Sequence, residues 1–395
     1  MHLRQFFLQH MAQTSAFPLM LEIERGEGVY LYDKDGKAYI DLIAGIGVSS
    51  LGHCHPNVVG AIKAQADKYL HTMVYGEYVL GPQVTLAQRL SDNLPASLNS
   101  VYFVNSGAEA TEGAMKLAKR YTGRYEIAAF KYAYHGSTQG AASLMWPKDF
   151  TQGYHPLLPG IVHLDFNDEK SLESITEHTA CVIVETIQAE WGVRKPLPAF
   201  IMALRRRCDE TGALLVLDEI QTGFGRTGSL FAFEHYGIVP DILLLAKGMG
   251  GGMPIGAFIA DQQLMSCLSH NPILGHITTF GGHPVSCAAS LATLDTLLEG
   301  DLIDAVPEKE ALFRHYLQHP AIKEVRSAGL LMAVELAGFD VVQAVIHRCL
   351  LEGVIIDWFL FNNRSLRIAP PLIITNEEIK TACQVILAAI EDCHN

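Results

Sequence analysis

Two short apolar runs, each followed by a charged residue, constrain the fold more than any other feature of the chain. The run Ala213–Leu217 ends in Asp218, and the run Ile242–Ala246 ends in Lys247 and a glycine-rich turn. Leucine- and valine-rich runs bounded by polar residues or glycines are typical of buried strands in a parallel sheet. Ligands bind at the carboxyl ends of such strands, so we expect the acid and the lysine where the chemistry occurs.

This pairing of a lysine with an acid indicates a specific chemistry. A lysine at a sheet edge forms a Schiff base with a carbonyl when its surroundings lower its pKa. An acid opposite it holds a protonated pyridine nitrogen, so Lys247 and Asp218 match the two ends of a pyridoxal phosphate site. From strand-end placement alone, a solvated lysine and an acid that caps the next helix remain the alternative.

Length and composition indicate a globular protein with two sizeable cores. The 395 residues are 49% hydrophobic and 18% charged. The net charge of −13 argues against nucleic acid and anionic membranes as partners. No apolar run approaches the roughly 20 residues of a membrane-spanning helix, and polar residues interrupt the N-terminal stretch, so we expect no signal peptide. The eight cysteines form no C-x-x-C pair, which favours reduced thiols in a cytoplasmic enzyme.

The central stretch carries a family resemblance. LDEIQTGFGRTG, followed by PDILLLAKGMGGGMPIGA, is similar to the signature of class III pyridoxal-phosphate aminotransferases, which include acetylornithine, ornithine and 4-aminobutyrate aminotransferases. Further motifs in the family's order extend the resemblance from GVYLYDKDGKAYIDL at 28–42 to LRIAPPLIIT at 366–375. The resemblance implies an α/β protein of fold type I, with a large doubly wound, mostly parallel sheet domain and a smaller α+β C-terminal domain.

The resemblance also implies domain boundaries and the residues around the cofactor ring. We expect residues 1–45 to form an arm and hairpin packing with the small domain, 46–289 the large domain, and 290–395 the small domain. Lys247 is implied to be the Schiff-base lysine and Asp218 the partner of the ring nitrogen. Three further side chains are implied around the ring: Ile220 on its face, Gln221 at its hydroxyl, and Glu185 near that hydroxyl.

A second strand end carries a pattern that suits a phosphate. Val101–Val104 predicts a strand, and Ser106, Gly107 and Ala108 open a helix. Free N–H groups and the positive dipole end of a helix favour an anion, although an ordinary helix cap is the alternative from these residues alone. The resemblance assigns the cofactor phosphate to Gly107 and Ala108, with Ser106 beside them.

The stretch KYAYHGSTQG follows the predicted strand Ile127–Phe130 and contains a departure from the relatives. From the residues alone Tyr134 and His135 fit a core equally well; the resemblance makes Tyr134 the aromatic that stacks on the ring and places His135 with it at the cofactor. The named relatives commonly carry a carboxylate-binding arginine where this chain has Ser137. A neutral hydroxyl makes no bidentate clamp, so we expect weak use of acetylornithine, ornithine and 4-aminobutyrate.

Three more residues bear on the substrate. Spacing alone makes Glu190 a solvated loop acid and Arg367 a surface residue. The resemblance implies instead that Arg367 anchors an α-carboxylate and that Glu190 masks it when an ω-amine reacts. Ile46 stands where ornithine aminotransferases carry a tyrosine, and an apolar residue there is typical of the acetylornithine and 4-aminobutyrate types.

Together these residues predict a transaminase that moves an amino group, an ω-amine of an amino acid or diamine, to a keto acid such as 2-oxoglutarate. An aminomutase or racemase on the same cofactor is the alternative. In the family Thr279 contacts the phosphate of the partner subunit's cofactor, and Thr278 beside it faces substrate, which implies a homodimer with shared sites.

Two motifs suggest other chemistry and are weak. Gly223, Gly225 and Gly228 satisfy G-x-G-x-x-G, but the acid that should end the following strand is absent: Asp241 precedes its strand, so we do not expect a nicotinamide site. His53-Cys54-His55 lacks both the spacing of a known ligand set and a third ligand nearby, so we expect a turn and no metal.

Overall fold

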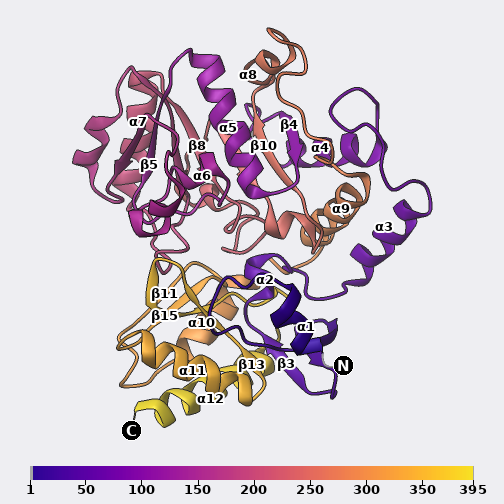
Figure 1. Cartoon of the computed structure of the whole chain (residues 1–395), viewed down its shortest axis with the longest axis vertical. Coiled ribbons are helices and arrows are strands. Elements are labelled where there is room, and N and C mark those ends of the chain that lie inside the picture. Colours follow the sequence, from indigo (N-terminus) through magenta and orange to yellow (C-terminus); the bar gives the residue numbers. More distant parts are fainter. Residues whose placement is uncertain (1–2, 395) are drawn as a thin grey trace.

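The structure, a computed structural model, describes residues 3–394, and its larger part is built on a seven-stranded sheet (Figure 1). The strand order is β4-β10-β9-β8-β7-β5-β6. The strands are β4 (Ser100–Val104), β5 (Glu126–Phe130), β6 (Ile161–Leu164), β7 (Thr179–Glu185), β8 (Leu214–Asp218), β9 (Ile242–Leu245) and β10 (Gly256–Ala260). Strand β10 is antiparallel to both of its neighbours, and all other pairs are parallel, as predicted.

Helices cover both faces of this sheet, which makes it doubly wound. Alternate residues of β8 belong to different apolar clusters: Leu215 packs with α7 (Pro198–Thr211), whereas Val216 packs with α5 (Gly107–Thr122). Every residue of β7, β8 and β9 is buried, which explains why these strands are continuous apolar runs. The remaining helices of this part are α2 (Ala44–Gly47), α3 (Pro56–Ala66), α4 (Gly81–Asp92), α6 (Gln139–Ala142), α8 (Gln262–Ser266) and α9 (Pro284–Glu299).

The smaller part contains two four-stranded sheets and joins the two ends of the chain. The first has the order β1-β2-β3-β13, and the second, β11-β12-β15-β14, is antiparallel. Their strands are β1 (Ile23–Glu27), β2 (Tyr30–Asp33), β3 (Ala38–Asp41), β11 (Glu324–Ser327), β12 (Met332–Glu335), β13 (Val354–Ile355), β14 (Asp357–Phe359) and β15 (Asn362–Ile368). The helices of this part are α10 (Val306–Tyr316), α11 (Phe339–Leu351) and α12 (Asn376–His394). The predicted hairpin is present as β2–β3, and β13 adds to it in parallel.

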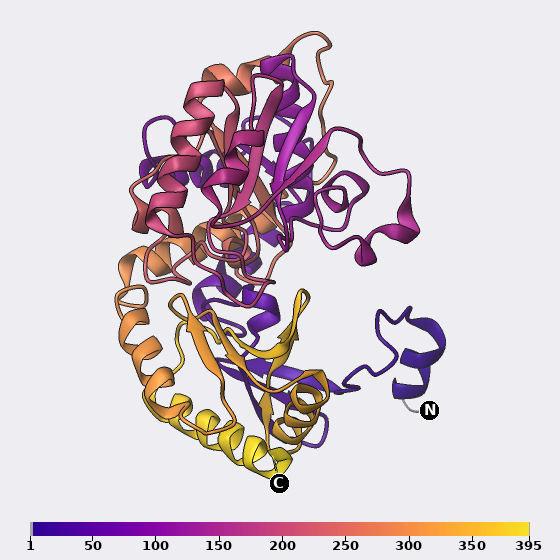
Figure 2. The same cartoon turned by 90° about the vertical axis from the view of Figure 1, so that its left-hand side faces the viewer.

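The N-terminal arm and helix α9 qualify the predicted organisation. Helix α1 (Leu3–His10) buries none of its side chains and projects away from the body in Figure 2, whereas we expected the arm to pack on it. Helix α9 runs without a break through residue 290 and packs on α3 and α4. The boundaries at residues 45 and 289 remain predictions.

The glycine motif in the loop after β8 does not open a helix. Gly225 and Gly228 adopt positive φ angles of 86° and 90° in a run of turns. The side chain between them, Arg226, is 1% exposed and donates to the backbone oxygens of Leu330 and Pro370 in the smaller part. These glycines therefore serve a loop that joins the two parts, and the strand–turn–helix unit of a dinucleotide site is not formed.

Candidate active site

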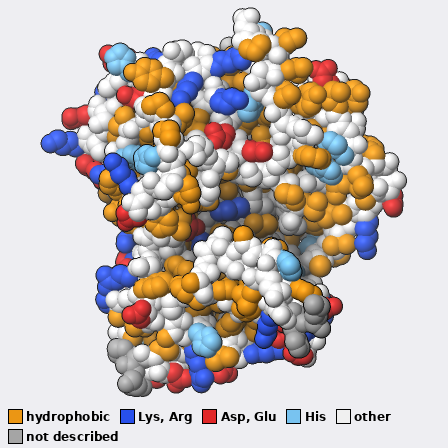
Figure 3. Space-filling view, in the orientation of Figure 1, with side chains coloured by type: hydrophobic (Ala, Val, Ile, Leu, Met, Phe, Trp, Pro, Cys, Tyr) orange, Lys and Arg blue, Asp and Glu red, His pale blue; other side chains and the backbone are white. Residues whose placement is uncertain are grey.

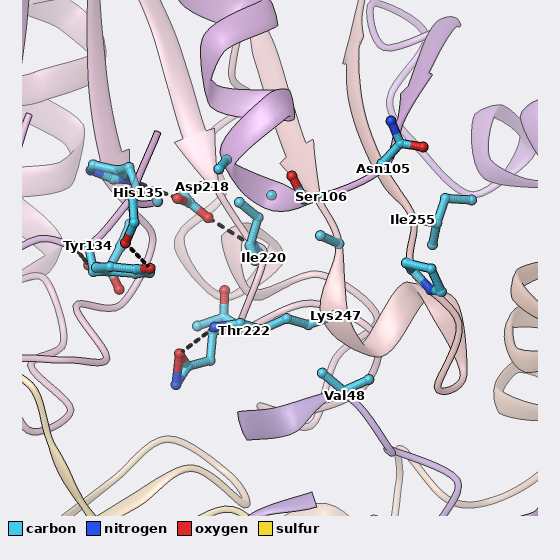
Figure 4. Close-up of a pocket in the computed structure, with 18 of the residues that line it drawn as sticks. Val48, Asn105, Ser106, Tyr134, His135, Asp218, Ile220, Thr222, Lys247 and Ile255 are labelled. Atoms are coloured by element: carbon cyan, nitrogen blue, oxygen red, sulfur yellow. Dashed lines mark hydrogen bonds and ion pairs between the residues drawn. The ribbon is translucent and has the colours of Figure 1, made fainter. Parts of the chain in front are cut away.

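A cavity of about 650 Å³ lies at the carboxyl ends of the parallel strands. Figure 4 shows side chains from separate elements facing it, among them His135, Asp218, Ile220 and Lys247. The cavity brings together nearly all residues predicted for the cofactor: Ser106, Gly107, Ala108, Tyr134, His135, Glu185, Asp218, Ile220, Gln221 and Lys247. Strand-end geometry and the start of one helix thus place them together, as the sequence led us to expect.

Asp218 is held in one orientation by two hydrogen bonds. Its Oδ2 lies 2.7 Å from Nδ1 of His135, and its Oδ1 accepts the backbone N–H of Ile220 at 2.9 Å. Because a carboxylate only accepts, the imidazole donates from Nδ1. Nε2 of the buried His135 has no partner. An acid 4% exposed and fixed in this way is arranged to hold a cationic group in the cavity.

Lys247 follows β9 and enters the cavity from a strained backbone. Its φ is 45°, a left-handed value that is rare for a residue with a side chain and typical of functional positions. Nζ donates to Oε1 of Gln221 at 3.0 Å, while Nε2 of Gln221 has no partner. Burial lowers the pKa of the Lys247 ammonium, which increases the share of nucleophilic free amine.

Tyr134 and Glu185 form the wall next to Asp218. The Glu185 carboxylate accepts the backbone N–H groups of Tyr134 at 2.8 Å and Ala189 at 2.9 Å. Burial raises the pKa of Glu185 to about 7, so near neutral pH this side chain both donates and accepts protons. The hydroxyl of Tyr134 lies 2.9 Å from Oγ of Ser137, the residue that replaces the expected arginine.

Helix α5 points its N-terminus into the cavity. Ser106 is the N-cap, and its Oγ accepts the backbone N–H of Glu109 at 3.2 Å. The helix cannot satisfy its own first amides, so those of Gly107 and Ala108 are available to an anion. A Cβ on Gly107 would lie 2.7 Å from Cδ1 of Ile220, so a larger residue at this position would require the Ile220 side chain to shift.

A second cavity of about 900 Å³ adjoins the first and contains the predicted substrate residues Ile46, Ser137, Glu190 and Arg367. Nη1 of Arg367 donates to Oε1 of Glu190 at 2.6 Å, so the predicted pair is formed. Burial alone would lower the pKa of Arg367, but the carboxylates of Glu190 and Asp357 outweigh burial and raise it. Arg367 is 6% exposed, not the surface residue that spacing alone suggested.

Asp357 is a residue of this cavity that the sequence reasoning missed. Both of its carboxylate oxygens bind Arg367: Oδ1 accepts from Nε at 2.8 Å and Oδ2 accepts from Nη2 at 3.1 Å. The two residues are direct cross-strand partners in the β14–β15 hairpin. The residue types alone do not reveal the register of this hairpin, and it is the register that places the acid opposite the arginine.

Thr278 and Thr279 line neither cavity of the single chain. Thr278 accepts a hydrogen bond from Asn105 Nδ2 at 3.0 Å, and Thr279 is exposed. Their implied contacts are with a partner subunit's site, so their role stays a prediction. Among the described residues no group of three metal-ligating side chains is found, and His53 Nε2 lies 2.9 Å from Oδ2 of Asp41.

Comparison with known proteins gives this geometry its context. The sequence matches the family model of class III aminotransferases over residues 11–390. The chain belongs to this family. It is 40% identical over 382 residues to acetylornithine aminotransferase of Caldanaerobacter subterraneus, covering 94% of each chain. It is also 40% identical over 384 residues to putrescine aminotransferase of Pectobacterium atrosepticum, covering 92% of this chain and 80% of that one.

Solved structures give the same assignment. A transaminase from the marine bacterium Virgibacillus superposes with a TM-score of 0.93 at 26% identity, covering 99% of this chain and 98% of that one. Ornithine aminotransferase from Toxoplasma gondii superposes with a TM-score of 0.91 at 31% identity, covering 99% and 93%. This class III aminotransferase is therefore an enzyme of amino-group transfer, and pyridoxal phosphate is its cofactor.

The residues of the first cavity fit that cofactor. Two polar atoms buried beside the cavity, Nε2 of His135 and Nε2 of Gln221, have no hydrogen-bond partner among the described residues. The glycine at the start of α5 leaves room for a ligand against the helix, and Asp218 and Lys247 occupy neighbouring strand ends. The aminotransferase thus offers an anion site, a carboxylate and an amine in one cavity. Among the described residues, no helix is both long and apolar enough to cross a membrane.

Proposed function

We propose that this aminotransferase uses Lys247 and Asp218 as its catalytic residues. The observation that carries the proposal is that Nζ of Lys247 and the Asp218 carboxylate enter one cavity from adjacent strands β9 and β8. When bound, pyridoxal phosphate supplies an aldehyde that condenses with amines and a ring that accepts electron density. The protein supplies the amine, the charge and the orientation.

Each polar group of the cavity has a distinct task in this proposal. Asp218 Oδ2, oriented by His135, holds a proton on the ring nitrogen. Lys247, whose pKa is lowered by burial, would carry a proton between the substrate carbon and the cofactor carbon. Gln221 accepts from Nζ and thereby aims the amine, while its free Nε2 donates to the ring hydroxyl.

The remaining cofactor residues bind and orient. The first amides of α5, at Gly107 and Ala108, with Ser106 beside them, hold the phosphate. Tyr134 and Ile220, which both line the cavity, would pack against the faces of the ring. Glu185 fixes the backbone of Tyr134 through the bond to its N–H at 2.8 Å.

Borohydride reduction followed by peptide mass mapping tests the assignment of the lysine. We expect the reduced adduct on the peptide that contains Lys247. An adduct on another lysine, or none, would contradict the assignment. Product analysis with and without a keto acid separates transamination from an aminomutase or racemase, because only transamination needs the co-substrate.

For the substrates, we propose an ω-amine donor and a keto acid acceptor such as 2-oxoglutarate. Glu190 masks Arg367 while the amine reacts and moves aside for the carboxylate of the acceptor. The ion pair at 2.6 Å supports the masked state. Relatives named for acetylornithine and putrescine support an amine remote from a carboxylate or without one.

We also propose that the enzyme is a cytoplasmic homodimer in which Thr279 contacts the partner's cofactor phosphate and Thr278 faces its substrate. Apolar side chains are exposed around helices α3 and α4 and in the segment before Thr278, where Figure 3 shows hydrophobic groups gathered. They are Leu70, Met73, Tyr78, Val79, Val84, Ile273, Leu274 and Ile277. Such a patch favours association of subunits, and the eight free cysteines favour the cytoplasm. The mass in solution, measured by light scattering, tests the dimer.

A further inference from the structure

The guanidinium of Arg367 has almost no hydrogen-bonding capacity left. Its Nε donates to Asp357 Oδ1 at 2.8 Å, and Nη2 donates to Asp357 Oδ2 at 3.1 Å and to the backbone oxygen of Trp358 at 2.9 Å. The single N–H of Nε and both N–H groups of Nη2 are thus used. Only Nη1, which donates to Glu190 at 2.6 Å, has a further N–H.

Movement of Glu190 alone does not open a carboxylate clamp. A bidentate clamp needs two parallel N–H groups, from Nε and Nη2 or from Nη1 and Nη2. Asp357 and Trp358 keep Nη2 occupied after Glu190 leaves, so an incoming carboxylate finds Nη1 alone. The register of the β14–β15 hairpin keeps the backbone of Asp357 opposite that of Arg367.

The charges around this cavity point the same way. Two carboxylates, Glu190 and Asp357, stand against one guanidinium, and Ser137 adds no charge. Burial lowers the pKa of Lys247, which weakens its contribution as a cation. A carboxylate at the far end of a donor would meet this excess of negative charge, whereas an ammonium would be attracted by it.

We propose that Asp357 is a specificity-determining residue, which prevents Arg367 from binding a substrate carboxylate with two parallel hydrogen bonds and makes a diamine without a carboxylate the preferred amine donor. This inference rests on the proposed function, because it names the donor class of that site. It also implies that a keto acid binds through a single contact on Nη1. Replacing Asp357 therefore lowers the KM for the keto acid.

A matched pair of donors tests the proposal in the holoenzyme. 1,5-Diaminopentane and 5-aminopentanoate present the same amine on the same chain and differ in the charge at the far end. We expect kcat/KM for the diamine to exceed that for the amino acid by at least about tenfold, the size of a favourable charged contact. Asp357→Asn should reduce this ratio by roughly tenfold, because loss of the Asp357 carboxylate leaves more of the positive charge of Arg367 to attract the carboxylate of the amino acid.

A second readout needs no turnover. Glutarate carries two carboxylates and no reactive group, so calorimetry reports how well the site binds a carboxylate. Wild type should bind it weakly, and Asp357→Asn should bind it about tenfold more tightly. Asp392→Asn removes an acid that pairs with Arg348 at 3.1 Å, far along the chain on α12, and should leave both readouts as in wild type.

The outcomes distinguish failure of the proposed role of Asp357 from failure of the proposed transaminase function. A wild-type preference for 5-aminopentanoate, tight glutarate binding by wild type, or an unchanged ratio in folded Asp357→Asn would overturn the role of Asp357 and leave the transaminase assignment intact. No turnover of any amine, together with no visible absorbance from bound cofactor, would overturn the proposed function, and the role of Asp357 would fall with it.

Discussion

The two ends of the active site are built differently, although their cavities share lining residues such as Lys247 and Glu190. The cofactor end consists of strand ends and a helix start of one sheet: Asp218 ends β8, Lys247 follows β9, and Gly107 opens α5. The substrate end is assembled across the fold, since Glu190 lies in a loop of the larger part and Arg367 lies 177 positions later in β15. At the cofactor end, the geometry of the backbone positions the functional side chains. At the substrate end, pairing between a few charged side chains positions them.

This difference has a consequence for evolution of specificity. Strand ends are fixed by the buried core of β7, β8 and β9, so the cofactor residues keep their places whatever the donor is. The charged residues of the substrate end lie on a short hairpin and a loop, and a single substitution among them changes which substrate charges the cavity binds. We therefore expect variants of the cofactor end to change rate and variants of the substrate end to change preference.

Lys247→Ala tests the cofactor end most severely. It removes the amine that carries the proton, so turnover should fall by about a thousandfold or more for every donor. Lys170→Ala, at an exposed lysine in the same part, is the control and should keep wild-type turnover. Steady-state rates with donor and keto acid measure the effect. Near-normal turnover of Lys247→Ala would show that another base transfers the proton.

Asp218→Asn should have the next largest effect. The amide keeps the shape but no longer stabilises a proton on the ring nitrogen, so kcat should fall by between about a hundredfold and a thousandfold for all donors alike. The matched control is Asp165→Asn, which removes an acid that follows β6 of the same sheet and pairs with Lys131 at 2.8 Å on the surface. If both variants behaved alike, the proposed role of Asp218 would be wrong.

Glu185 gives a pH-dependent effect on stability. Burial raises its pKa from 4.5 to about 7. The folded protein therefore holds a proton that the unfolded chain releases as the pH rises between these values. The resulting stabilisation is complete below pH 4.5 and is lost as the pH rises through about 7, and between pH 5 and pH 7 the loss is roughly 2 kcal/mol.

Chemical unfolding at several pH values, at constant cofactor concentration, measures this loss. Glu185→Gln should show a free energy of unfolding that declines less between pH 5 and pH 7 than in wild type, by about the same 2 kcal/mol. Glu169→Gln, at an exposed position, should follow the wild-type curve. Parallel curves for wild type and Glu185→Gln would mean that Glu185 is ionised throughout.

The same contrast explains which features the sequence revealed. The strands around Asp218 and Lys247 and the helix after Ser106 follow from local patterns, namely apolar runs, a helix cap and glycines, so their placement was predicted correctly. The clamp of Asp357 on Arg367 depends on the register of β14 against β15. Register follows from packing of the whole hairpin rather than from residue types, and composition gave no sign of it.

The N-terminal helix α1 shows another limit of the sequence. The segment has the apolar residues of a packed arm, yet none of its side chains is buried in the single chain. Whether an amphipathic helix is covered depends on what lies opposite it, which its own residues do not encode. The exposed apolar patch around α3 and α4 raises the same question, and the predicted dimer is the answer we propose.

The smallest expected effect is at Ser137, where a substitution should change the preference between donors and leave the maximal rate nearly unchanged. Ser137→Arg adds a cation to a cavity with two carboxylates and one free contact on Arg367. The ratio of kcat/KM for 4-aminobutanoate to kcat/KM for 1,4-diaminobutane should rise by roughly tenfold, and kcat for the preferred donor should change little. Ser174→Arg adds the same charge at an exposed position outside the cavity and should leave the ratio unchanged. A gain for both donors alike would show that Ser137 affects the cofactor, through its contact with Tyr134 at 2.9 Å, rather than the far end of the substrate.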